Sequence, residues 1–303
     1  MLQATSSILL VRPANFGYNS QTAVSNSFQQ QLNLPLHELN KKVADEFENF
    51  ITTLKAKGVN VFVVDDTIEP IKPDAIFPNN WVSFHEDGTV VLYPMCTPNR
   101  RLERRMDVVD SLKEKFKFTR VIDLSEHEKN NRFLEGTGSI VFDHEHKIAY
   151  ACLSPRTDKE ILIDLAKKLD YEACYFTAYD KLDKEIYHTN VMMCIGSGFA
   201  IVCLDCIKDH LEKNNLINKL NSTGHEIIAV SNEQINQFAG NMLFVDTHTK
   251  QKILICSQSA FNSLEEGQKE KINKYCELVA IPIPTIETIG GGSARCMMAE
   301  IFS

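Results

Sequence analysis

The chain alternates short apolar stretches with longer stretches in which apolar residues recur every three or four positions. Residues 7–11 and 59–64 are short, apolar and rich in β-branched side chains, which is typical of strands. Between them, residues 36–54 carry Leu, Val and Phe at helical spacing, and Gly58 follows as a stop signal. The first part of the chain therefore predicts a strand, a helix and a second strand.

The rest of the chain repeats one order of elements, a hairpin followed by a helix and a short strand. Four hairpins are predicted, in which residues 81–84 pair with 89–93, 139–142 with 148–152, 191–195 with 199–204, and 242–245 with 252–256. The helices are expected at about 158–169, up to about 220, and at 264–275, and the closing strands include 226–230 and 278–283. This repetition predicts an α/β fold, and because no linker interrupts it we expect one domain over residues 1–303.

A polar or reactive residue stands in front of each hairpin and of the last strand, at a nearly constant spacing. Five residues hold this position: Asp74, Glu135, His188, Asn241 and Cys296. Successive members are separated by 61, 53, 53 and 55 residues. If the units close into a ring, all five side chains point at one central site. The spacing therefore predicts rotational pseudosymmetry with the chemistry at the centre.

Composition and charge exclude some classes of function. The chain is 44% hydrophobic and 24% charged, which is ordinary for a globular protein. Its net charge of -8 argues against a nucleic-acid or anionic-membrane partner. No apolar run approaches the roughly 20 residues that span a bilayer. Since the N-terminus also has no signal-peptide pattern, we expect a cytoplasmic protein with reduced cysteines that acts on small molecules.

Three of the five residues can carry the chemistry of a thiol enzyme. Cys296 follows a run of three glycines, whose exposed amide N–H groups would favour the thiolate together with the cation of Arg295. His188 is a general acid–base candidate because imidazole titrates near neutral pH, and Glu135 could orient it. Each residue taken alone could instead be structural. Their matching repeat positions favour a shared site.

The sequence resembles the guanidine-modifying, or pentein, superfamily over essentially its full length. The motifs that carry the resemblance are NFGYN, PDAIFPNNW, EGTGS, HTN, CLSPRTD and GGGSARCMMAE. The superfamily includes arginine deiminases, dimethylarginine hydrolases, amidinotransferases and succinylarginine dihydrolase, and the resemblance is closest to the citrulline-utilisation type of hydrolase. It implies a five-bladed pseudosymmetric α/β propeller of ββαβ units around a central active-site channel, which agrees with the spacing.

The resemblance also implies roles for single residues. A catalytic trio would supply the nucleophile, the general acid–base and its carboxylate partner: Cys296, His188 and Glu135. Arg156 would bind the substrate carboxylate with its planar fork. Arg100 resembles a second carboxylate-binding arginine, although Arg101 could fill that role instead. For both arginines of the site, a solvated surface position is the alternative.

The sequence departs from the arginine-type members at two positions. Asn80, with Asn79 beside it, and Asn190 stand where those members hold the cationic guanidinium with carboxylates, and only Asp74 remains acidic. A buried carboxylate opposite a neutral group is unpaired and costly, whereas an amide both donates and accepts hydrogen bonds. A neutral ureido group needs both. We therefore expect citrulline as the substrate, hydrolysed through a covalent thiol intermediate to ornithine, ammonia and carbon dioxide, with the order of the leaving groups open.

Two alternatives remain. An arginine deiminase or amidinotransferase acting on a guanidino substrate is supported by Asp74, and a non-catalytic binding protein of the same fold would not need the trio. We expect no cofactor and no metal, because no ligand cluster of suitable spacing is evident. The partner is a small-molecule amino acid, and a homo-oligomer is allowed. Four histidines in hairpin turns are expected to be solvated: His85, His144, His146 and His248.

Overall fold

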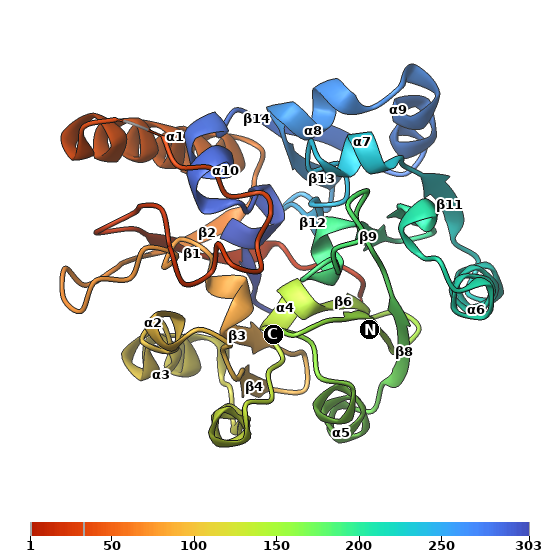
Figure 1. Cartoon of the computed structure of the whole chain (residues 1–303), viewed down its shortest axis with the longest axis horizontal. Coiled ribbons are helices and arrows are strands. Elements are labelled where there is room, and N and C mark those ends of the chain that lie inside the picture. Colours follow the sequence, from red (N-terminus) through yellow and green to blue (C-terminus); the bar gives the residue numbers. More distant parts are fainter. Residues whose placement is uncertain (1, 33, 303) are drawn as a thin grey trace.

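The structure, a computed structural model, describes residues 2–32 and 34–302, and its strands form five three-stranded sheets. In every sheet the first strand is antiparallel to the second, and the second is parallel to the third. Figure 1 shows the five sheets arranged in chain order around a common centre. The sheets are β15 (Ala299–Glu300), β1 (Ser7–Arg12) and β2 (Asn60–Asp65); β3 (Val82–Phe84), β4 (Thr89–Leu92) and β5 (Arg120–Asp123); β6 (Ile140–Asp143), β7 (Ile148–Leu153) and β8 (Glu172–Thr177); β9 (Met193–Gly196), β10 (Phe199–Val202) and β11 (Glu226–Ala229); and β12 (Leu243–Asp246), β13 (Lys252–Ser257) and β14 (Glu277–Ile281).

The two ends of the chain close the ring. β15 pairs with β1, so that Ile8 lies opposite Glu300 and Leu9 lies opposite Ala299. The last strand therefore serves as the first strand of the unit that begins the chain. This closure brings the segment before β15, which contains Cys296, to the same position in its unit as the segments before the other first strands. The predicted five-unit α/β ring is confirmed.

Exposure decreases from the rim of the ring to its centre. The first strands β3, β6 and β9 are buried at every position, whereas the third strand β5 is exposed at three of its four positions. The apolar run over residues 140–142 of β6 suits a strand that is covered on both faces. The first strands therefore form rigid supports for whatever side chains precede them.

Amphipathic helices connect the second strand to the third and lie on the outside of the ring (Figure 1). They are α1 (Leu36–Ala56), α3 (Met106–Phe116), α5 (Lys159–Leu169), α6 (His210–Ser222) and α9 (Glu266–Asn273). Asp158 and Asp209 cap α5 and α6 by accepting backbone N–H bonds. The helix expected near 264–275 is confirmed as α9, which starts after Glu265 with a capping box. The short helix α8 (Gln258–Ser263) before it, separated from α9 by the extended Leu264, was not predicted.

A single helical turn precedes the first strand in four of the five sheets. These turns are η1 (Pro78–Asn80), α4 (Gly136–Ser139), η3 (Thr189–Val191) and η5 (Ala294–Met297). α4 packs against η1 and η3, and η1 packs against η5. Gly136 and Gly138 make this approach feasible, since a Cβ at Gly136 would lie 2.2 Å from the Asn79 carbonyl oxygen and one at Gly138 would lie 2.4 Å from Asn80 Nδ2. The EGTGS motif is therefore a packing requirement at the centre.

The remaining short helices connect these units. They are α2 (Pro98–Arg101), η2 (Ser125–Asn130), η4 (Leu204–Cys206), α7 (Asn232–Ile235) and α10 (Pro284–Gly290). Of the helices in residues 2–32 and 34–302, none is both long enough and apolar enough to cross a membrane.

The prediction for the turn histidines is wrong for two of the four. His146 and His248 are exposed, but His85 and His144 are only 4% and 5% exposed. His85 and His144 pack against Phe142, and His144 also packs against Phe302 near the C-terminus. In the closed ring, neighbouring units cover these hairpin turns. The sequence pattern of one unit does not reveal this burial.

Candidate active site

The expected nucleophile lies at the centre of the ring. Cys296 is 5% exposed in η5, and its backbone N–H donates to the Ser293 carbonyl oxygen at 3.0 Å. Glu287 of α10 holds this segment through a 2.6 Å hydrogen bond from the Ser293 hydroxyl. Arg295 does not act as expected, because its guanidinium donates to the Glu300 carboxylate at 2.8 Å and to the Met298 carbonyl oxygen. Its charge is already neutralised, so other groups must assist the sulfur.

Two asparagine side-chain amides, and not Arg295, contact the sulfur of Cys296. Asn241 Nδ2 lies 3.2 Å from Cys296 Sγ, and Asn190 Nδ2 lies 3.5 Å from it. Asn241 is fixed on both sides, since its Nδ2 also donates to the Asn190 carbonyl oxygen and its Oδ1 accepts the Arg295 backbone N–H at 3.1 Å. Sulfur is a weak acceptor as a thiol and a strong one as a thiolate. The two amides therefore favour the reactive, anionic form.

The histidine and its carboxylate partner form a buried pair. His188 Nε2 and Glu135 Oε2 are 2.8 Å apart. Burial lowers the pKa of His188 to about 4, although the hydrogen bond and charge of Glu135 act in the opposite direction. Burial raises the pKa of Glu135, but the charge of Arg156 and the bond to His188 outweigh it, so that the net shift of this carboxyl pKa is downward. At neutral pH the pair holds a neutral imidazole beside a carboxylate, and the imidazole is ready to accept a proton.

Glu135 is held in place by other groups as well. Its Oε1 accepts the Cys96 backbone N–H at 2.9 Å, and its Oε2 lies 3.5 Å from Arg156 Nη1. Arg156 is 2% exposed, and its guanidinium lies over the Tyr187 ring with 4.8 Å to the ring centre. The same guanidinium donates to the Ser25 hydroxyl and to the Thr22 carbonyl oxygen at 3.0 Å. Arg156 is therefore a site residue and not a surface charge.

Arg100, and not Arg101, lies at the site. Its guanidinium makes two hydrogen bonds to the Glu103 carboxylate, at 2.8 and 2.9 Å, and a third to Asn80 Oδ1 at 2.8 Å. Burial raises the pKa of Glu103 to about 7. Because Arg100 donates hydrogen bonds to both oxygens of this carboxylate, we assign Glu103 as ionised. Arg101 instead donates to backbone carbonyls at Met95 and Cys96, and pairs with Glu128.

Asp74 lies at the arginine end of the site. Its Oδ2 accepts from Asn19 at 2.7 Å and from Thr22 at 3.3 Å, and Arg100 Nε is 3.7 Å away. Its Oδ1 is buried without a hydrogen-bond partner. Burial raises the pKa of Asp74, and the charge of Arg100 opposes this. This acid accompanies the arginines and has no hydrogen bond to the sulfur.

One cavity joins most of the predicted residues. Six of them line a space of about 280 Å³: Asp74, Asn80, Arg100, Arg156, His188 and Cys296. Glu135 is joined to it through His188, and Asn190 through Cys296. Sequence reasoning missed Thr22 and Asn26, which line the same cavity from the β1–α1 loop, and Asn19 behind them. It also gave Asn241 no role, although the spacing had marked the residue.

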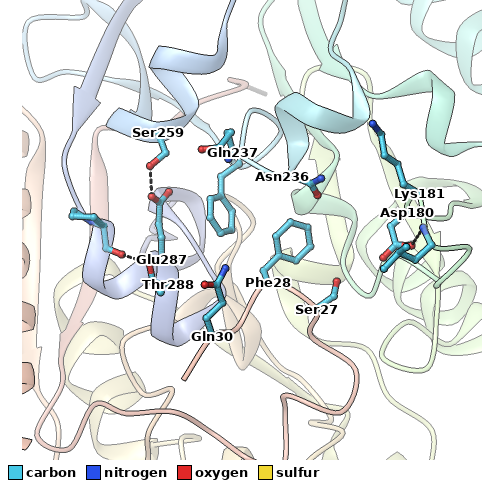
Figure 2. A pocket seen from close by; sticks show the side chains of 13 residues that line it. Ser27, Phe28, Gln30, Asp180, Lys181, Asn236, Gln237, Ser259, Glu287 and Thr288 are labelled. Atoms are coloured by element: carbon cyan, nitrogen blue, oxygen red, sulfur yellow. Dashed lines mark hydrogen bonds between the residues drawn. The ribbon is translucent and has the colours of Figure 1, made fainter. Parts of the chain in front are cut away.

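A larger hollow lies outside this site. It opens to solvent between the β1–α1 loop and α10, where Phe28, Asp180 and Glu287 line it, and spans about 1020 Å³ with the open solvent in its mouth included (Figure 2). Its Glu287 carboxylate is already bound by the Ser259 hydroxyl at 2.6 Å, and none of the catalytic trio reaches it. We therefore place the active site in the smaller cavity, because that cavity holds the reactive side chains.

Comparison with known proteins gives a family and a fold. The family described as N,N dimethylarginine dimethylhydrolase, eukaryotic, matches residues 12–303. No curated protein sequence matches the chain. Among solved structures, the arginine dihydrolase ArgZ of the cyanobacterial ornithine–ammonia cycle superposes with a TM-score of 0.76 at 19% identity, covering 98% of this chain and 40% of that one. The chain thus spans less than half the length of that protein.

Two further structures match over their whole length. A variant of the ArgZ N-terminal domain, covalently bound to a reaction intermediate, superposes with a TM-score of 0.75 at 19% identity, covering 97% of both chains. A dimethylarginine hydrolase (DDAH) of Pseudomonas aeruginosa, complexed with citrulline, superposes with a TM-score of 0.66 at 14% identity, covering 99% of this chain and 100% of that one. At these identities the structural matches establish the fold. The expected guanidine-modifying superfamily is confirmed, while the citrulline-utilisation branch stays a prediction.

Proposed function

The chain belongs to the eukaryotic N,N-dimethylarginine dimethylhydrolase family, and from that premise we propose that it is a cysteine hydrolase whose substrate is the ureido group of citrulline. The observation that carries the choice of substrate is the set of groups around the sulfur. Among the described side chains, those hydrogen-bonded to Cys296 Sγ are Asn190 and Asn241, both neutral amides. A neutral ureido group fits such a set better than a cationic guanidinium does.

The opposite end of the cavity suits an α-amino acid. Arg100 and Arg156 supply positive charge for a carboxylate, and the free Oδ1 of Asp74 supplies an acceptor for an ammonium group. Arg156 now binds the Ser25 hydroxyl and the Thr22 carbonyl oxygen, groups that a substrate carboxylate would replace. Asp74 is then a ligand of the amino group. In this assignment Asp74 binds the amino group and is not the carboxylate that binds a guanidinium.

The first half of the reaction follows from the neutral imidazole. Cys296 gives its thiol proton to His188, and the thiolate attacks the ureido carbon to form a C–S bond. The amide N–H groups of Asn190 and Asn241 lie where they can stabilise the negative charge that develops. The bond from this carbon to the side-chain nitrogen then breaks, and that nitrogen takes the proton from His188 and leaves as the amine of ornithine.

The second half releases the enzyme. Water gives a proton to His188 and attacks the S-carbamoyl group, and the C–S bond breaks. The proton returns to the sulfur, and carbamate separates into ammonia and carbon dioxide. Glu135 holds the imidazole and balances its charge while it is protonated. The sum is citrulline and water giving ornithine, ammonia and carbon dioxide.

A second candidate is hydrolysis of a guanidino substrate, arginine or its N-methylated form. The name of the matching family favours it, and so does Asp74, a carboxylate with one buried oxygen still free. The same thiolate could attack a guanidinium carbon. The two candidates differ in the charge of the reacting group, and the asparagines disfavour the cation.

The test is an assay of the untagged protein with citrulline, arginine and N,N-dimethylarginine in separate reactions. Ornithine and ammonia from citrulline, with little turnover of the other two, supports the proposal. Citrulline with ammonia or dimethylamine from the guanidino substrates, and no turnover of citrulline itself, supports the second candidate. No turnover of any of the three indicates a binding protein.

Two variants assign the chemistry. Cys296→Ala is expected to lower turnover by at least about 10³-fold, because the covalent route is lost. Cys174→Ala is the matched control, since this buried cysteine packs in the core between β8 and α6 without reaching the site. Full activity of the Cys296→Ala protein contradicts the proposal.

A further inference from the structure

Three potential metal ligands meet at the hairpin-turn end of β6, away from the catalytic cavity. Asp143 is the last residue of β6, His146 lies in the following turn, and His225 stands just before β11 of the next unit. His146 Nδ1 lies 3.0 and 3.1 Å from the two Asp143 oxygens, and His225 Nε2 lies 3.8 Å from Asp143 Oδ2. One ligand atom from each residue lies within 4.8 Å of the other two.

The buried histidine of this group has a free lone pair. His225 is 4% exposed, and its Nε2 has no hydrogen-bond partner. Its Nδ1 lies 2.8 Å from the Thr223 hydroxyl, which itself donates to the Lys219 and Leu220 carbonyl oxygens at 3.1 and 3.0 Å. With its hydrogen used there, the hydroxyl accepts from Nδ1–H, and on this ground we assign the Nδ1–H tautomer. Nε2 is then an acceptor that faces the carboxylate of Asp143, another acceptor.

Two buried acceptors that face each other are unfavourable, and a bound cation would satisfy both of them. No Lys or Arg nitrogen of the described residues lies within 4.0 Å of the Asp143 carboxylate, whose titratable neighbours within that distance are His146 and His225. Imidazole nitrogens suit first-row transition ions and are poor ligands for magnesium or calcium. Tetrahedral zinc sites, with metal–ligand distances of about 2.0–2.2 Å, separate their ligand atoms by about 3.3 Å. The separations seen here bracket that value.

We infer that Asp143, His146 and His225 form a binding site for a divalent transition ion of the zinc type. The ion would replace the Nδ1 proton of His146, which moves to Nε2 at the exposed edge of that ring. Because His146 is exposed, the ion has a path from solvent, and water can complete its coordination. Thr223 holds the His225 ring in the ligating tautomer, as outer-shell groups do at metal sites.

The site would join two units of the ring. Asp143 and His146 belong to the β6–β7 hairpin, while His225 belongs to the unit of β9, β10 and β11. Glu135 precedes β6 and Asp143 ends it, so the metal would bind at the opposite end of this strand from the catalytic pair. Its role is to stabilise the ring, and the inference does not depend on which substrate the enzyme takes.

The test measures zinc and cobalt binding by the untagged Cys296→Ala protein, so that metal held by the active-site thiol does not contribute. We expect one Zn²⁺ per chain by calorimetry, and a Co²⁺ absorption spectrum typical of nitrogen and oxygen ligands without sulfur. His146→Ala is expected to weaken zinc binding at least 10-fold. Since His146 is exposed, this variant should fold. Asp143→Asn, which keeps the size of the side chain, is expected to weaken binding similarly.

His248→Ala provides the matched control. His248 is likewise an exposed histidine next to a hairpin strand, but it contacts only the Gly58 carbonyl oxygen among the hydrogen bonds of the described chain. Zinc binding should be unchanged in this variant. The inference is overturned if the Cys296→Ala protein binds no zinc, or if His146→Ala and His248→Ala bind it as tightly as their parent does.

Discussion

Two carboxylate–histidine groups flank the same short strand, and their surroundings give them different chemistry. At the site end of β6, Glu135 is bound to His188, with Arg156 at 3.5 Å and Arg100 at 4.0 Å. At the turn end, Asp143 faces His146 and His225, and no Lys or Arg nitrogen of the described residues lies within 4.0 Å of its carboxylate. Both carboxylates are fully buried.

The difference teaches that neighbouring charge decides what a buried carboxylate–histidine group can do. At the site end, arginines already compensate the acid, so a metal ion would meet repulsion, and the imidazole is left free to exchange protons. At the turn end the acid is uncompensated, and a divalent ion supplies what is missing. The residue types alone do not distinguish a catalytic pair from a metal site.

The largest effect is expected from exchanging the two acids for amides. Glu135→Gln should lower kcat by about 10³-fold, because the imidazole loses the group that orients it and balances its charge. Asp143→Asn should leave kcat within about 2-fold of the wild-type value. Steady-state assays on citrulline, or on whichever substrate the protein turns over, measure both.

Zinc titration of the same two substitutions, each made in the Cys296→Ala protein so that the active-site thiol does not contribute, is the second half of the test. Glu135→Gln should retain the zinc affinity of its parent, whereas Asp143→Asn should lose at least about 10-fold. If Asp143→Asn lost activity as severely as Glu135→Gln does while remaining folded, the two ends of β6 would not be independent, and the comparison would fail.

A smaller effect is expected from the residue that positions the sulfur. Asn241→Ala removes the 3.2 Å contact to Cys296 Sγ and leaves the Arg295 N–H without its acceptor. A hydrogen bond to a charged group contributes about 1.5–3 kcal/mol, which corresponds to a loss of roughly 10- to 150-fold in kcat with little change in KM. The rate of Cys296 alkylation by iodoacetamide at fixed pH should fall in parallel.

Asn236→Ala is the control for that measurement. Asn236, like Asn241, precedes strand β12, but it is exposed and lines the larger hollow away from the sulfur. Equal alkylation rates in the Asn241→Ala and wild-type proteins would show that Asn241 only supports the backbone.

Much of this arrangement could be predicted from the sequence because the signal is local and repeated. Strand and helix patterns recur unit by unit, and a residue in front of each hairpin must reach the centre once the ring closes. Glu135, His188 and Cys296 were found this way, and Asn241 carried the same signal without being assigned a role. The spacing fixes where a side chain lies, but not whether it binds substrate or another side chain.

Other features depend on packing between units, which a linear pattern does not contain. Thr22 and Asn26 reach the cavity from an irregular loop that has no periodicity. Arg295 is next to the nucleophile in sequence, yet its guanidinium pairs with Glu300. His225 meets Asp143 only because two units of the ring lie side by side. The approach of His225 to Asp143 is long-range in sequence and was therefore missed, whereas Arg295 and Glu300 are only five residues apart, and the linear pattern does not reveal which way the guanidinium turns.

Lowering the pH should destabilise the folded protein, because neutral histidines are buried at both ends of the sheets. Burial lowers the pKa of His188, at the site end, and of His85, at the turn end of β3, to about 4 from about 6.5. Since the unfolded chain takes up these protons below about pH 6.5 and the folded chain does not, the free energy of unfolding should fall as the pH drops from 6.5 towards 4. Each such histidine contributes about 1.4 kcal/mol per pH unit.

A variant isolates one of these histidines. In His85→Gln, the decrease in the free energy of unfolding between pH 7.5 and pH 5 should be smaller than in wild type by about 1–2 kcal/mol, as measured by urea unfolding. The exposed His37→Gln on α1 is the control and should keep the wild-type decrease. An undiminished decrease in His85→Gln would mean that this histidine is protonated in the folded protein.

The smallest effect is expected from a surface hydrogen bond between the two units that the metal would join. Ser197, in the β9–β10 turn, donates a 2.7 Å hydrogen bond to Glu145 beside His146, at the protein surface. An exposed contact of this kind contributes little, so Ser197→Ala should change the free energy of unfolding by less than about 0.5 kcal/mol. A ligand that binds only the folded state at 100 times its Kd adds about 2.7 kcal/mol. At that zinc concentration zinc should therefore stabilise the Ser197→Ala protein as much as wild type, but His146→Ala by at least about 1.3 kcal/mol less, because its Kd is at least about 10-fold higher. If instead Ser197→Ala removed the stabilisation by zinc, the hydrogen bond and not the metal would hold the two units together at this end of the ring.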